Sequence, residues 1–131
     1  MIRSIAAVLV GLIVTFALVL LFHQATVLIT GIPLDGTHEA PYLTANIVAS
    51  FLAGACGGAA AVRVAARAPH GHVVVLALVI LLVSLPTLFM GASPGQPTWY
   101  PLVMSVIGPV SVLTGGLLAA YRWRDRAAVS A

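Results

Sequence analysis

The stretch YLTANIVASFLAGACGGAAAVR, residues 42–63, carries most of the structural information in this chain. Its first 21 residues contain no Asp, Glu, Lys or Arg, and the run ends at the basic residue Arg63. A helix that crosses the hydrocarbon core of a bilayer needs about 20 apolar residues. The length and composition of this stretch therefore predict a membrane-spanning helix.

Three further runs have the same character, because residues 5–22, 73–90 and 102–121 also lack acidic and basic side chains. Uninterrupted runs of this length favour helices, since they are about twice as long as the alternating strands of a membrane β-barrel. We therefore predict an all-α membrane protein with one domain, residues 1–131, folded as a compact up-down bundle of four transmembrane helices. The predicted helices cover approximately residues 5–22, 42–62, 73–92 and 101–121.

The composition agrees with a chain that lies in lipid. Of its 131 residues, 61% are hydrophobic and 7% are charged, and the mean hydropathy is +1.13. A water-soluble domain has about 25% charged residues. The net charge of +3 comes from arginines spread over three short segments, so no basic patch for nucleic acid is expected.

The basic residues predict the orientation in the membrane. All six of them flank one set of run ends: Arg3, Arg63, Arg67, Arg122, Arg124 and Arg126. The two other connections carry only the acidic residues Asp35 and Glu39. Basic residues are retained on the cytoplasmic side of a membrane, so both termini are predicted to be cytoplasmic in a multi-pass protein of the inner membrane.

The ends of the runs raise two further expectations. The apolar segment 25–32 follows His23, so the first helix either runs on past this histidine or the segment lies at the membrane interface. The aromatic pairs at the two ends of the fourth run, Trp99 with Tyr100 and Tyr121 with Trp123, are typical of interfacial anchors.

Small residues recur every four positions in the second run. The first row is Ala45, Ala49, Ala53, Gly57 and Ala61, and a parallel row is Ser50, Gly54 and Gly58. Small side chains allow helix backbones to approach closely in a membrane. We therefore expect the second helix to be the inner one, in contact with at least two neighbours, and we expect Cys56 to be a small buried residue. Gly115 and Gly116 form a weaker packing surface of the same kind in the fourth helix.

A few polar residues interrupt the runs. Asn46 lies beside Ser50 on the small-residue face of the second helix, so the pair forms either an interhelical contact or part of a polar path for a solute. Pro86 and Pro109 each remove a hydrogen-bond donor from a helix. The hydroxyl groups that are expected to satisfy the freed carbonyls belong to Ser84, Thr87, Ser105 and Ser111.

No group of residues predicts catalysis or a cofactor. His23, His38, Glu39 and Asp35 come from one side of the bundle, but their spacing matches no known metal-ligand pattern. The single cysteine is separated from every histidine by much of a helix, and the serines are isolated in apolar runs, so no nucleophile has a base beside it. We expect neither an enzyme nor a metal site.

Residues 50–58 (SFLAGACGG), followed by Arg63 and by His70 or His72 at the start of the third helix, resemble an uncharacterised family of small bacterial four-helix membrane proteins. The Pro-Thr-Trp-Tyr turn at 97–100 and the glycine pair at 115–116 fit the same pattern. The resemblance implies a fold and a bacterial inner membrane, and it implies no activity. Residues 46–51 also resemble the Asn-x-x-Gly-Ser-Phe stretch of small fluoride channels, with Ala49 in place of the glycine.

Two functions follow as hypotheses. The first is a small non-enzymatic membrane protein that acts through helix packing, either with itself or with a larger membrane partner. The alternative is a channel or permease for a small neutral or passively moving solute, with Asn46 and Ser50 on its path. The lipid bilayer is the one partner that both hypotheses require.

Overall fold

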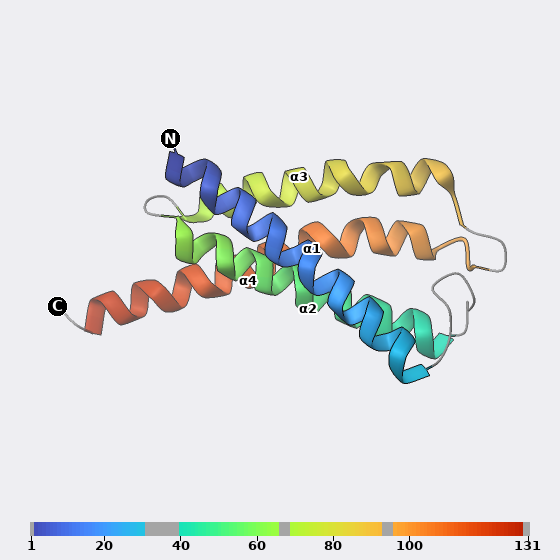
Figure 1. The fold of residues 1–131 in the computed structure, drawn as a ribbon. Helices are drawn as coiled ribbons and strands as arrows, with labels where there is room; N and C mark the ends of the chain where they lie inside the picture. Colours follow the sequence, from blue (N-terminus) through green and yellow to red (C-terminus); the bar gives the residue numbers. More distant parts are fainter. Residues whose placement is uncertain (1, 31–39, 66–68, 93–95, 130–131) are drawn as a thin grey trace.

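The computed structural model describes residues 2–30, 40–65, 69–92 and 96–129, with the side chains of the last helix described as far as Trp123. These residues form four helices and no strand. The helices are α1 (Ile2–Thr30), α2 (Ala40–Val64), α3 (Pro69–Met90) and α4 (Tyr100–Val129). Their directions alternate, so the two ends of the chain lie at the same end of the bundle (Figure 1).

Local sequence explains where three of the helices start and where one of them stops. Pro41, Pro69 and Pro101 each lie in the first turn of a helix, where a missing N–H costs nothing because that group has no partner within the helix. α3 stops at Met90, and Gly91 follows with a φ of 72°. Glycine adopts this left-handed conformation without strain, which makes it the usual residue after the last helical turn.

The helix ends differ from the predicted ones mainly in α1 and α4. α1 continues to Thr30, far beyond the predicted end at residue 22, and α4 continues to Val129 instead of residue 121. Of the two alternatives for the segment after His23, the helix is therefore the correct one. A helix satisfies the backbone hydrogen bonds of an apolar segment within the segment itself. The side chain of Thr26 is satisfied in the same helix, because its hydroxyl donates to the carbonyl of Phe22 at 2.8 Å.

α2 has two main neighbours on different faces. It packs along α1 and along α4, whereas α1 and α4 do not contact each other. α3 packs mainly against α4 and touches α1 and α2 (Figure 1). The prediction that the second helix touches at least two neighbours is therefore confirmed.

The bundle is apolar outside as well as inside. Its fully buried side chains include Leu76, Val62, Val73 and Val112, while large apolar side chains such as Leu20, Leu82 and Phe89 are exposed. All four helices are long and apolar enough to cross a membrane. The basic side chains that are described, Arg3, Arg63 and Arg122, belong to helix ends at the end of the bundle that also holds the termini (Figure 1).

Candidate functional site

The contact between α2 and α4 depends on two glycines that approach the partner helix directly. A methyl group at Gly58 would overlap the backbone carbonyl oxygen of Val112 and would lie 2.9 Å from the backbone nitrogen of Gly116. A methyl group at Gly54 would overlap the hydroxyl of Ser111. The two backbones therefore touch at Gly58, as small residues permit in membrane helices.

Gly57 makes the corresponding contact with α1. A side chain there would meet the backbone oxygen of Gly11 at 2.7 Å and would overlap the hydroxyl of Thr15. Thr15 turns that hydroxyl back onto its own helix, where it donates to the Gly11 carbonyl at 2.8 Å. Ala61 is buried at the same contact. A side chain at Gly11 would lie 2.9 Å from the Cβ of Ala61.

The two glycines of the pair in α4, Gly115 and Gly116, lie against different helices, α2 and α3. A methyl group at Gly115 would overlap the backbone of Ala55 in α2, whereas one at Gly116 would lie 2.5 Å from a methyl carbon of Val73 in α3. Adjacent residues on a helix point about 100° apart, so one pair of glycines fits between two helices. Gly116 is buried and Gly115 is half-buried.

The small-residue row of α2 is only partly used within the chain. Ala53, Gly57 and Ala61 are buried, but Ala49 is half-buried and Ala45 is exposed. Among the described residues, no other helix covers Ala45, because the neighbours of α2 pack on other faces. The first turns of this row therefore remain open for a contact outside the bundle.

Asn46 uses its amide inside the bundle. Its Nδ2 donates a hydrogen bond to the hydroxyl oxygen of Tyr100, at the start of α4. Tyr100 is 6% exposed, so it is a buried partner of α2 and not the interfacial anchor that we expected, although Trp99 beside it is 49% exposed. Ser50, the other candidate path residue, is buried one turn further along α2.

The hydroxyl groups near the helix prolines bind carbonyls other than the freed ones. Ser84 donates to the carbonyl of Ile80 at 2.7 Å, and Ser111 donates to that of Gly108 at 2.7 Å. Ser105 donates to the carbonyl of Pro101 at 2.8 Å. The expectation that these groups bind the carbonyls four residues before Pro86 and Pro109 is wrong, because a hydroxyl reaches most easily the carbonyl three or four residues before its own position.

Hydroxyl groups also connect α3 to α4. The hydroxyl oxygens of Thr87 and Ser105 are 3.0 Å apart, and Ser105 also lies 3.3 Å from the carbonyl oxygen of Ser84. Thr87 itself donates to that same carbonyl at 2.6 Å. These groups form a polar link next to Pro86, so this part of α3 is tied to α4.

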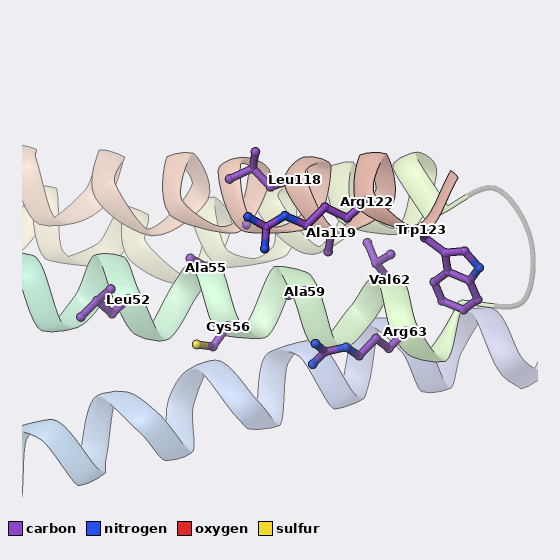
Figure 2. Close-up of a pocket in the computed structure, with 11 residues that line it drawn as sticks. Leu52, Ala55, Cys56, Ala59, Val62, Arg63, Leu118, Ala119, Arg122 and Trp123 are labelled. Atoms are coloured by element: carbon purple, nitrogen blue, oxygen red, sulfur yellow. The ribbon is translucent and has the colours of Figure 1, made fainter. Parts of the chain in front are cut away.

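A groove of about 800 Å³ lies over the open face of α2, beside α4. Its wall is made of small residues from both helices, namely Ala55 and Ala59 from α2 and Gly115 and Ala119 from α4. Figure 2 shows Ala55, Ala59 and Ala119 along the groove. Cys56 also lines the groove and is exposed, so the expectation that it is buried is wrong. α2 makes its contacts on other faces, which leaves the side of Cys56 open.

The groove has a basic end and an apolar end. Arg63, Arg122 and Trp123 lie at the end of the bundle that holds the termini, and Leu52 lies at the other end of the groove. Both arginine side chains bend back along the groove, toward Ala59 and toward Leu118 (Figure 2). The reason is that the Cα–Cβ bonds of a helix tilt toward its N-terminus, and both residues lie near the C-terminal ends of the apolar segments of α2 and α4.

The histidines do not assemble a metal site in the part of the chain that the structure describes, where no three metal-ligating side chains form a group. His23 lies within α1 and is half-buried. His38, Glu39 and Asp35 lie outside the described residues. His70 and His72 lie in the first turns of α3.

Sequence reasoning missed two contact residues that carry visible signals. Gly11 is the only glycine in the first run, and it sits against α2 and Leu76. Its isolation among bulky residues is the signal for one close contact. Tyr100 has an apolar ring and one polar hydroxyl group. This combination is suited to a buried side chain that binds the amide of Asn46.

Comparison with known proteins finds no match to this chain among protein-family models, curated proteins or solved structures.

Proposed function

We propose that this protein is a non-enzymatic integral membrane protein that spans a bacterial inner membrane four times and acts through contacts between helices. Both termini lie in the cytoplasm, since the described arginines share their end of the bundle (Figure 1). The apolar outer surface is suited to lipid and needs no charge there.

The exposed outer end of the small-residue row carries the proposal of helix contacts. Within the row, only Ala45 is exposed, and Ala49 next to it is half-buried. Small residues favour association in a membrane because they let two backbones approach closely. A second copy of this chain, or a larger membrane protein, packs a helix against this segment.

The orientation is tested with reporters at the ends of the chain. A fluorescent protein that folds only in the cytoplasm, fused after Ala131, is expected to be bright, because arginines keep this end inside. Alkaline phosphatase, which is active only outside the cytoplasm, is expected to be active when it is inserted between residues 35 and 39. Activity of the phosphatase after Ala131 would contradict the orientation.

The helix contact is tested by cysteine crosslinking in native membranes. In a Cys56→Ser background, which has no other cysteine, Ala45→Cys is expected to form a crosslinked product above the monomer on mild oxidation or with a short bifunctional reagent. The control is Val106→Cys, an exposed position near the outer start of α4, which is expected to stay monomeric. Equal yields at both positions would show random collisions and would overturn the proposal.

A channel or permease has less support. The Asn46 amide has a hydrogen-bond partner within the bundle, Tyr100, and Ser50 is buried. The hydrogen bond of Asn46 therefore stabilises the contact of α2 with α4, and no observation favours transport over packing.

A further inference from the structure

We propose that the groove between α2 and α4 binds one anionic phospholipid, with the headgroup at Arg63 and Arg122 and an acyl chain over the small residues. The site is distinct from the helix contact at Ala45. It rests on the proposed function only for the insertion of the bundle in a membrane.

The length of the groove suits a phospholipid. It extends from Leu52, at the middle of the span Pro41–Val64, to Arg63 at its basic end. At 1.5 Å per residue this distance is about 16 Å. The hydrocarbon core of a bilayer is about 30 Å thick, so the groove covers about one leaflet. A phospholipid also occupies one leaflet, so its length matches that of the groove.

The shape of the groove suits an acyl chain. Ala55, Ala59, Gly115 and Ala119 have at most one side-chain carbon each, and together they form a shallow surface between larger residues. The close approach of Gly115 to the backbone of Ala55 forms the floor of this surface. A flexible chain fills such an irregular hollow with little strain, and filling it recovers the dispersion contacts that an empty hollow lacks.

The charge at one end of the groove selects the headgroup. Arg63 and Arg122 are exposed, and both direct their guanidinium groups back along the groove (Figure 2). Their aliphatic stems lie along the groove, so the guanidinium groups can meet a headgroup at its basic end. The segment 122–126 carries three arginines and one aspartate, so its net charge remains positive. Guanidinium groups bind phosphate through paired hydrogen bonds, and Trp123 suits the same interfacial depth.

The test measures which lipid lies next to Trp123. A Trp99→Phe variant leaves Trp123 as the only tryptophan, and it is reconstituted into vesicles of phosphatidylcholine with a small fraction of phosphatidylglycerol. In one set the phosphatidylglycerol carries brominated chains that quench tryptophan, and in the other set an equal amount of phosphatidylcholine carries them. The headgroup composition is the same in both sets, so the ratio of quenching reports enrichment of the anionic lipid at the groove.

We expect brominated phosphatidylglycerol to quench Trp123 more strongly than brominated phosphatidylcholine. Each arginine near an anionic headgroup should contribute roughly a fivefold preference. Arg63→Gln or Arg122→Gln should each lower the enrichment about fivefold, and the double variant should remove most of it. The matched control is Arg3→Gln, which removes the same charge at the same end of the bundle but outside the groove, and it should leave the enrichment unchanged.

Other outcomes overturn the site. Equal quenching by the two sets shows that no anionic lipid is selected. An equal loss in Arg3→Gln and in the groove variants shows attraction by the whole surface. If no brominated lipid quenches Trp123, the site is wrong and so is the insertion of this end of the bundle. Quenching without headgroup preference leaves the membrane insertion intact, so the two failures are distinguishable.

Cys56 provides a second measurement in detergent micelles. Because this lone thiol lines the groove, bound phosphatidylglycerol should slow its reaction with a thiol reagent, and phosphatidylcholine should not. The protection should disappear in the Arg63→Gln and Arg122→Gln double variant. Protection that persists in that variant, or that both lipids produce equally, contradicts a headgroup site at these arginines.

Discussion

Replacing Gly58 by alanine is expected to lower the free energy of unfolding by about 2 kcal/mol. The new methyl group would overlap the backbone carbonyl oxygen of Val112, and a backbone atom cannot rotate away as a side chain can. α2 and α4 would have to separate, which would loosen the contact that holds the two halves of the bundle together. The loss should be visible as a lower midpoint in unfolding of the micelle-bound protein by a denaturing detergent.

Gly71→Ala is the matched control for this substitution. Gly71 also lies in a helix, but nothing is found within 4 Å of a side chain at this position. Alanine stabilises a helix relative to glycine by about 0.5–1 kcal/mol, so this variant should be unchanged or slightly more stable. Equal effects of the two substitutions would mean that Gly58 does not touch α4.

Leu76→Ala is expected to cost about 2 kcal/mol, at the lower end of the range for buried leucines. Leu76 is 0% exposed, and one of its methyl carbons lies where a side chain at Gly11 would be, so it fills the contact between α3 and α1. In a membrane the lost contribution is packing and not transfer out of water, because lipid tails are as apolar as leucine. Heating the purified protein and following the monodisperse fraction measures the loss.

Leu78→Ala on the same helix is the control for Leu76→Ala. It removes the same side chain from an exposed position, so it shows whether the loss of stability comes from packing. Leu78 is 54% exposed, so lipid or detergent replaces the side chain that is removed. Its stability should stay within about 0.5 kcal/mol of the parent protein. If Leu78→Ala were as destabilising as Leu76→Ala, the assignment of the inner and outer faces of α3 would be incorrect.

The helices and the basic end of the bundle were predictable from composition alone. Residues 42–62 have no charged side chain, and Arg63 follows them, so this run is recognised without knowledge of its neighbours. The inner position of α2 was also predictable, because glycine and alanine at every fourth residue indicate close backbone contact. The sequence did not decide whether α1 extends past His23. His23 and Gln24 interrupt the apolar run, but the residues that follow them are again apolar.

The choice of partner faces depended on the tertiary structure. α1 and α3 are apolar on every side, so their sequences do not distinguish a face that packs from a face that meets lipid. The exposure of Cys56 and of Ala45, and the burial of Tyr100, follow from how α2 is rotated between α1 and α4. The groove arises only where two such faces meet. Local composition therefore accounts for the four helices and their charged end, whereas contacts between segments distant in sequence produce the site, because their energies depend on both partners at once.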